Sequence, residues 1–282
     1  MRTKNILLAF VGAVSLLSGC DVKDPIYDTP HPQHGKITLT TDWTGRTEGI
    51  NVPAGYTVQI GDYSATLSGA TNTIDNLFTP GTYHVYIYNT ADNISVSGTT
   101  ATADYAAGNP GPFFSCAMDA AIEKDKEHTF TAVMKQQVRR LTLVIEPEGD
   151  AVDRIVGITA SLSGVAGTLD IKDDTHGSAT SVPLAFTKIA AGTDAGKWTA
   201  TAWLLGITGG EKKLTGTISF TDGNPADMPL ESDLTAELAS FNADKKTPLA
   251  LGSTLVETPA GTGFTATIDK WETIDRNEIV AD

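Results

Sequence analysis

Short stretches in which apolar and polar residues alternate run through most of this chain, and they constrain its fold more than any other feature. Between positions 37 and 43, for example, the odd positions hold Ile, Leu, Thr and Trp, and the even positions hold Thr, Thr and Asp. Because successive side chains of a β-strand point to opposite faces, each such stretch predicts a half-buried strand. Turn pairs such as Gly61-Asp62 and Pro80-Gly81 separate the stretches. Short strands divided by turns predict an all-β chain built as an antiparallel sandwich.

The pattern predicts two series of strands. The first comprises residues 37–43, 56–60, 64–67, 83–88 and 94–97, and the second comprises residues 128–134, 138–145, 155–162, 167–171, 182–187, 197–205, 214–220 and 264–271. Residues 83–88 carry aromatic or apolar side chains on both faces, so we expect this strand to be central. The leucines of segment 230–241 fit helical and strand spacing equally well, and we predict a strand that ends in one helical turn.

Residues 101–127 break the alternation with a Gly-Asn-Pro-Gly-Pro run at 108–112 and a charged run at 123–127. Composition shifts of this kind are typical of domain boundaries. We therefore expect a Greek-key β-sandwich domain over 35–105, a connecting segment over 106–127 and a second β-sandwich domain over 128–282.

The first nineteen residues have the features of an export signal. Arg2 and Lys4 precede an apolar run over 6–17, and small residues then lead to Cys20. The run is too short to span a bilayer, which needs about 20 apolar residues. The pattern resembles the lipobox of bacterial lipoproteins, so residues 1–19 are predicted to be removed and Cys20 to carry lipid. The alternative is an ordinary secretory peptide with a chance cysteine. Residues 20–34 contain three prolines and are expected to form a flexible tether.

Charge and cysteine content limit the possible partners. The net charge is −14, and an acidic surface repels nucleic acid phosphates and anionic lipid headgroups. The membrane link must therefore be covalent, and nucleic acid binding is not expected. The only other cysteine is Cys116, so there is no intrachain disulfide framework, and we expect a buried structural thiol.

The sequence shows no constellation that would carry chemistry. The segment 261–266, Gly-Thr-Gly-Phe-Thr-Ala, imitates a dinucleotide loop but leads into a strand, so we interpret it as a hairpin turn. His31 and His34 are near each other only in the tether, and the pair Asp173 and Asp174 is expected to be solvated. No cofactor or metal is predicted, and the chain is not expected to be an enzyme. Carboxylate pairs that converge only in space stay open.

Several segments together resemble a known family, the FimB/Mfa2-type fimbrial anchor lipoproteins of Bacteroides-like bacteria, which are relatives of the fimbrillins. The resemblance rests on the lipobox at Cys20, GKITL at 35–39 followed by Asp42-Trp43, PAGYTV at 53–58, PGTYHVYIYN at 80–89, MKQQVRRLTL at 134–143, ASLSGVAG at 160–167 and ATIDKW at 266–271. It implies two tandem transthyretin-like sandwiches and a cell-surface lipoprotein of the outer membrane. It further implies an anchor or accessory subunit that joins fimbrial stalk subunits by β-strand exchange. Arg46 lies near the position where stalk subunits are processed by an arginine-directed protease, but we expect an exposed turn residue here.

Two other functions remain as alternatives. A surface glycan-binding lipoprotein of a polysaccharide-uptake system would need exposed aromatic platforms, for which the candidates are Trp43, Trp198, Trp203 and Trp271. Each tryptophan lies in strand-like alternation, where burial in the core is the commoner outcome. The other alternative is an enzyme whose site forms only in space.

Overall fold

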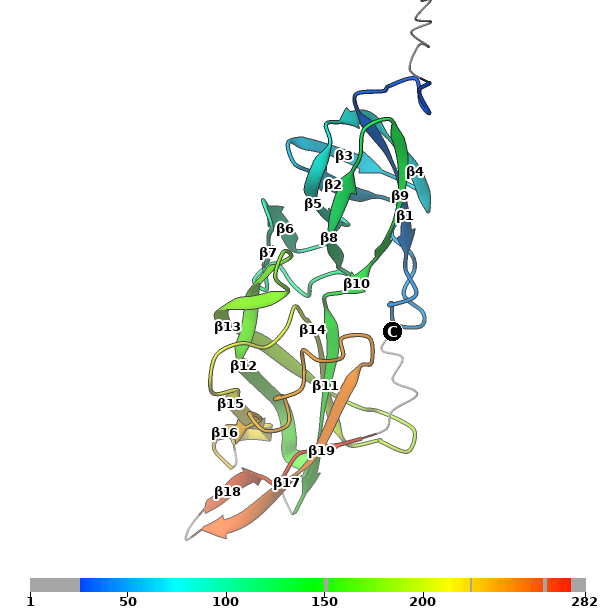
Figure 1. Cartoon of the computed structure of the whole chain (residues 1–282). Helices are drawn as coiled ribbons and strands as arrows, with labels where there is room; N and C mark the ends of the chain where they lie inside the picture. The colour runs from blue at the N-terminus through cyan, green and yellow to red at the C-terminus, as the bar shows by residue number, and fades with distance from the viewer. Residues whose placement is uncertain (1–25, 150–151, 224, 261–262, 275–282) are drawn as a thin grey trace, which may run out of the picture.

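The computed structural model describes residues 26–149, 152–223, 225–260 and 263–274 (Figure 1). Cys20 and the predicted signal peptide lie outside the described residues. Within this part of the chain, the helical elements are two short 3-10 turns, Val152–Arg154 and Thr221–Gly223. None of the described helices is long and apolar enough to cross a membrane. The predicted all-β fold class is confirmed, and the strands form two units that lie end to end (Figure 1).

The N-terminal unit consists of two sheets that face each other across one core. The first sheet has the order β4 (Thr71–Phe78), β1 (Gly35–Asp42), β9 (Lys126–Val133). The second has the order β10 (Lys135–Gln136), β8 (Phe114–Ile122), β5 (Gly81–Tyr88), β2 (Tyr56–Ile60), β3 (Tyr63–Leu67). Alternate residues of β1, β2 and β5 point into the core, as their sequence periodicity predicts.

Strand β5 is central, as predicted, because it pairs with β2 on one side and β8 on the other. Its core face carries Val85 and Ile87, which are 2% and 0% exposed. On its other face, Tyr86 and Tyr88 pack against a small apolar cluster between the two units. Both faces of the strand are thus covered near its C-terminal end, which explains why this segment lacks simple alternation.

The segment expected to connect two domains, residues 106–127, differs from that expectation. It contains β8, which pairs with β5 over eight positions inside the N-terminal unit. Strand β8 escaped prediction because its sequence, FSCAMDAAI, follows a proline- and glycine-rich run and has no regular alternation. Strand β9 then returns to pair in parallel with β1. We propose that the N-terminal unit extends to about residue 137 rather than to 105.

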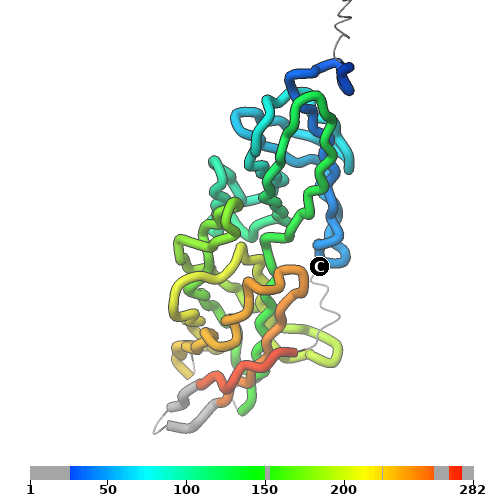
Figure 2. The backbone as a smooth tube through the Cα atoms, in the orientation of Figure 1, coloured from blue at the N-terminus to red at the C-terminus, as the bar shows by residue number. Residues whose placement is uncertain are grey.

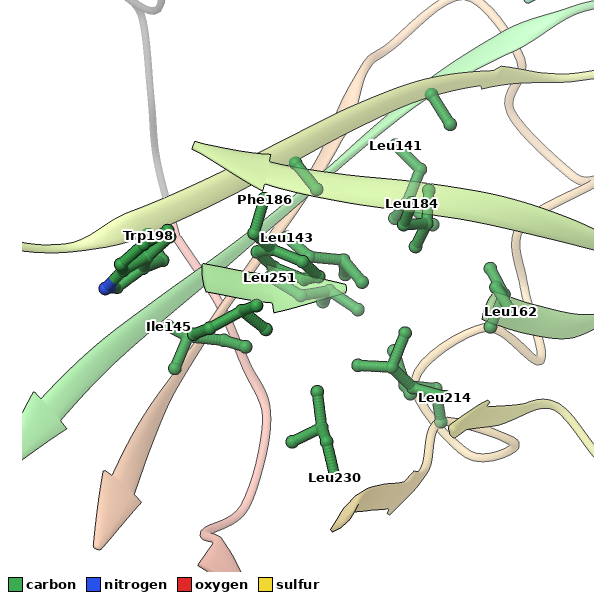
Figure 3. Packing of buried hydrophobic residues seen from close by; sticks show 14 of the residues in the cluster. Leu141, Leu143, Ile145, Leu162, Leu184, Phe186, Trp198, Leu214, Leu230 and Leu251 are labelled. Carbon is green, nitrogen blue, oxygen red and sulfur yellow. The ribbon is translucent and has the colours of Figure 1, made fainter. Parts of the chain in front are cut away.

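The C-terminal unit is a second sandwich. Its strand order is β16 (Met228–Asp233), β15 (Lys213–Phe220), β12 (Ile155–Asp170), β13 (Thr175–Lys188), β14 (Trp198–Leu204), β11 (Arg139–Glu148), β17 (Leu249–Ala260), β18 (Gly263–Ile268), with β19 (Glu272–Thr273) also on β17. Strand β13 pairs with β12 along most of its length but with β14 only at Thr187 and Lys188. It therefore passes from one layer to the other, and leucines, isoleucines and Trp198 fill the space between them (Figure 3).

Three details of the C-terminal unit test the sequence predictions. The predicted strands 155–162 and 167–171 form one long strand, β12, with an irregularity between Leu162 and Val165. Strand β16 is present as predicted, and it is followed by consecutive turns in which the predicted helical turn is reduced to one bond, from the Leu238 amide to the Leu234 carbonyl. Strand β17 was not predicted, because Gly252 and Pro259 interrupt its alternation.

One hairpin crosses between the units. Strands β6 (Ile94–Ser97) and β7 (Thr100–Ala103) follow β5 in sequence, yet β7 pairs with β12 of the C-terminal unit, with Thr102 opposite Thr168. In Figure 2 the tube of this hairpin lies beside the end of the second unit that faces the N-terminal unit. The small cluster beneath it includes Phe113, Val138 and Leu205. The units are therefore joined by a sheet and a core, not only by a linker.

Candidate functional site

The residues singled out for metal binding do not assemble a metal site. In the described ranges, no group of three or more His, Cys, Asp or Glu residues is arranged to hold an ion. His31 lies with Nδ1 3.0 Å from the Thr29 hydroxyl and 3.2 Å from the His34 carbonyl oxygen, so it organises its own loop. Asp173 and Asp174 are exposed, as expected, and Asp174 lies 3.6 Å from Lys135.

The tryptophans do not form an aromatic platform in the described part of the chain. Trp43, Trp198 and Trp271 are 7%, 5% and 3% exposed and belong to the two cores. Trp203 is half-buried and packs against the cluster between the units. The predicted burial of Trp43, Trp198 and Trp271 is confirmed, and no two of the four tryptophans are exposed for stacking on a sugar.

Cys116 and Arg46 both have structural surroundings. The Cys116 side chain is half-buried against the N-terminal core, and burial raises the pKa of its thiol, which lowers the thiolate fraction at neutral pH. Arg46 is half-buried rather than exposed, because Nε donates to the Ile50 carbonyl at 3.0 Å and Nη1 to the Trp43 carbonyl at 3.0 Å. It closes the loop after β1, a role that sequence alone does not reveal.

The N-terminal segment is fixed to the turn between β8 and β9. The Asp125 carboxylate accepts hydrogen bonds from the Asp28 amide at 2.7 Å, the Thr29 amide at 2.7 Å and the Thr29 hydroxyl at 2.8 Å. The Asp125 amide in turn donates to the His34 carbonyl at 2.9 Å. Residues 28–34, expected to be part of a flexible tether, are thus held at the end of the molecule away from the C-terminal unit (Figure 1). We call this contact the Asp125 clamp.

Strand β1 follows the clamp directly and occupies the middle of its sheet. It pairs in parallel with β9 over eight positions and antiparallel with β4 on the other side. Ile37 and Leu39 are each 1% exposed and lie in the core. The chain cannot release β1 without opening both the sheet and the core, so this strand is a permanent part of the unit.

Strand β3 is an open edge of the N-terminal unit in the part of the chain that the structure describes. It carries no charge and no proline, and its inward residues Tyr63, Ala65 and Leu67 are only half-buried. By contrast, β9 begins with Lys126 and Glu127, and β16 contains Pro229 together with Glu231 and Asp233, all of which discourage strand addition. Strand β3 thus lacks the features that usually protect an edge.

A buried polar network joins the two units behind β10. The side-chain nitrogen Nε2 of Gln136 donates to the backbone carbonyl of Lys245 at 2.9 Å, and Lys245 Nζ donates to Gln137 Oε1 at 2.8 Å. Arg139 donates to the Phe241 carbonyl at 2.8 Å and lies 5.0 Å from the centre of the Phe241 ring. These contacts hold the loop after β16 against the junction, and no sequence motif indicated them.

The fold and these features can be compared with known proteins. The sequence model of the fimbrillin-A associated anchor proteins Mfa1 and Mfa2 matches residues 56–277 of this chain. The chain belongs to this family. No curated protein matches it significantly.

Solved structures share the fold of this anchor-family chain. A candidate adhesin from Bacteroides ovatus is 17% identical, with a TM-score of 0.60, 88% of this chain covered and 95% of that chain. The fimbrial anchor protein Mfa2 from Porphyromonas gingivalis is 11% identical, with a TM-score of 0.55, and the match covers 83% of this chain and 95% of that chain. Candidate polysaccharide-binding proteins from Bacteroides thetaiotaomicron are 8% identical, with a TM-score of 0.56 and coverage of 82% and 95%. The predicted family is confirmed, and at these identities the structures establish the fold alone.

Proposed function

We propose that this protein is the lipid-anchored base or an accessory subunit of a fimbria on the outer membrane, and that it performs no chemistry. The observation that carries the proposal is the match of the anchor-family model over residues 56–277. The cores account for three of the four tryptophans, and the described residues present no metal constellation. These features favour a structural role over the glycan-binding and enzymatic alternatives.

The Asp125 clamp fits a role in anchoring. If lipid is attached at Cys20, seven residues separate it from Asp28, and an extended chain of that length reaches roughly 25 Å. The clamp holds the chain at the free end of the N-terminal unit, so the C-terminal unit extends away from the attachment point (Figure 1). A short tether ending in a fixed contact would hold the long axis of the protein away from the membrane.

Strand β3 is the edge that we propose for pairing with a stalk subunit. Strand β1 fills its own place in the other sheet, so an incoming strand must add to an open edge rather than replace β1. A strand beside β3 would cover the half-buried Tyr63, Ala65 and Leu67 and pair with its free backbone groups. Such a contact combines backbone hydrogen bonds with apolar burial, and both slow dissociation.

The geometry of the β2–β3 hairpin supplies a sharp test of this edge. Ile60 pairs with Tyr63 across a two-residue turn, so Tyr63, Ala65 and Leu67 direct their amides toward β2, and Ser64 and Thr66 direct theirs outward. Thr66→Pro would remove one outward donor and leave the β2–β3 hydrogen bonds in place. Thr66→Val, which keeps the amide, is the matched control.

We expect cells carrying Thr66→Pro to lose attached fibres in electron micrographs while the variant remains in the membrane fraction. Cells carrying Thr66→Val should keep their fibres. Normal fibres in the Thr66→Pro strain would show that β3 is not the edge used.

Deletion of the gene tests the anchor function itself. Loss of the base should release fibres into the medium or change their length, while stalk subunits are still made. The measurements are electron microscopy of the deletion strain and immunoblotting of stalk subunits in the medium. Unchanged, cell-attached fibres together with lost growth on one polysaccharide would replace the anchor function with glycan binding.

A further inference from the structure

Lys245 at the unit junction is a buried cation whose hydrogen-bond partners are not carboxylates, and the Asp174 carboxylate acts on it only through space. The residue is 9% exposed. Its ammonium donates to Gln137 Oε1 at 2.8 Å and to His176 Nε2 at 2.7 Å. Among the residues that the structure describes, it forms no ion pair with a carboxylate. Because an ammonium has three protons, one donor is left without an acceptor in this part of the chain.

Both partners of Lys245 are neutral. Burial, followed by the nearby Lys245 charge, lowers the pKa of His176 to about 4, so its ring is uncharged at neutral pH and accepts through Nε2. The ring is held in place because it packs against Gly206, where a Cβ atom would come within 2.3 Å of His176 Cδ2. Burial also lowers the pKa of Lys245 to about 8, which leaves it largely protonated at pH 7. Buried charges in proteins are normally paired, so this one calls for a counter-ion.

The surroundings are cationic although the whole protein is acidic. Lys135 and Lys246 line the same pocket as Lys245. Of the acids there, Asp174 lies 3.6 Å from Lys135. Asp244 accepts hydrogen bonds from the amides of Lys246 and Thr247 at 3.0 and 3.1 Å. The pocket lining thus carries three lysines and two aspartates, which leaves one positive charge in excess, and Lys245 is the buried member of the three lysines.

The pocket has room for a small anion. Its volume is about 300 Å³, and its lining includes Lys135, Gln136, Gln137, Asn242, Lys245 and Lys246. Ammonium groups bind carboxylates through charge-assisted hydrogen bonds, and three lysines line this pocket. The pocket lies where the two units meet, apart from the β3 edge.

We infer that this junction pocket is a binding site for a carboxylate, which accepts the remaining Lys245 proton and is drawn in by Lys135 and Lys246. The carboxylate could belong to a free small acid or to an acidic side chain of a bound peptide, and both present the same two oxygens. This site goes beyond the fimbrial function proposed above, and it does not depend on which edge pairs with a stalk subunit.

The test uses the chain from residue 21 onward, which retains every residue of the described fold. Sodium acetate is titrated against sodium chloride at constant ionic strength, and a blocked aspartate dipeptide is titrated in parallel. The readouts are the NMR signals of the Lys245 side chain, including its pKa, and the thermal midpoint. The variants are Lys245→Met and Lys135→Met, with the exposed Lys172→Met as the matched control.

We expect saturable changes at Lys245 with acetate, an upward shift of its pKa and a rise in the thermal midpoint. Lys245→Met should weaken binding by about tenfold or more, because a charge-assisted hydrogen bond is lost. Lys135→Met should weaken it by about threefold, and Lys172→Met should leave it unchanged. A tighter response to the dipeptide than to acetate would identify a peptide side chain as the source.

Two results would overturn the inference. One is a Lys245 signal and pKa that are the same in acetate and chloride, a measurement on the unsubstituted protein that needs no variant to fold. The other is an equal acetate response in the Lys245→Met and unsubstituted proteins.

Discussion

Replacement of Leu39 tests whether β1 is a permanent part of the N-terminal unit. Leu39 lies at the centre of β1, between β4 and β9, and is 1% exposed. Leu→Ala at a fully buried site costs about 2–5 kcal/mol, the larger values applying where neighbours cannot collapse into the cavity. Because both flanking strands hold the backbone of β1, we expect Leu39→Ala to lower the free energy of unfolding by about 3 kcal/mol. That is a large fraction of a typical domain stability of roughly 5–15 kcal/mol.

The assay is urea unfolding of the chain from residue 21, followed by tryptophan fluorescence, to which Trp43 contributes from the same core as Leu39. If the free energy of unfolding falls by about 2 kcal/mol per molar urea, Leu39→Ala should lower the urea midpoint of unfolding by about 1.5 M. Thr38→Ala is the control on the same strand, since Thr38 lies on the outer face and only shares a hydrogen bond of 3.1 Å with Thr73. It should lower the midpoint by about 0.5 M or less. Equal shifts for the two variants would refute the conclusion that β1 is anchored through its core face.

Three further predictions address the lipid, the junction and the crossing hairpin. Cys20→Ala should abolish labelling by radioactive palmitate, and a labelled variant that stayed in membranes would contradict the lipobox interpretation. His176 has a folded-state pKa of about 4 against about 6.5 unfolded, so its contribution to stability is present above pH 6.5 and is lost as the pH falls toward 4. As the pH is lowered across that range, the urea midpoint should fall less steeply in His176→Gln than in the unsubstituted protein. Parallel profiles of the two proteins would show that another group causes the loss of stability at low pH. Tyr105→Phe removes a buried hydroxyl that donates to the Ala166 carbonyl at 3.2 Å and accepts from the Leu205 amide at 2.9 Å. The substitution should lower the free energy of unfolding, measured by thermal unfolding, by about 1–2 kcal/mol. An unchanged stability would show that the hydroxyl does not hold the end of the β6–β7 hairpin.

The alternation of apolar and polar residues was sufficient to predict a strand where one face of that strand lies on a core and the other on the surface. Strands β1, β2 and β5 were predicted because their alternating residues face one core and one outer surface. The pattern was insufficient for β8 and β17, where Pro, Gly and small residues obscure the period. Segment 106–127 was therefore interpreted as a connection, although β8 is a strand in the interior of its sheet.

The sequence by itself determined the all-β class, the burial of most tryptophans, the absence of recognisable catalytic motifs and the resemblance to anchor proteins. Each of these depends on residue type and short-range spacing. Only the tertiary structure decided that β1 pairs with β9, that the β6–β7 hairpin joins β12, and that Lys245 meets Gln137 and His176. Those contacts join residues far apart in the chain. Alternation specifies which face of a strand is buried but not which strand lies beside it, because register and packing across a core are set by the whole fold at once.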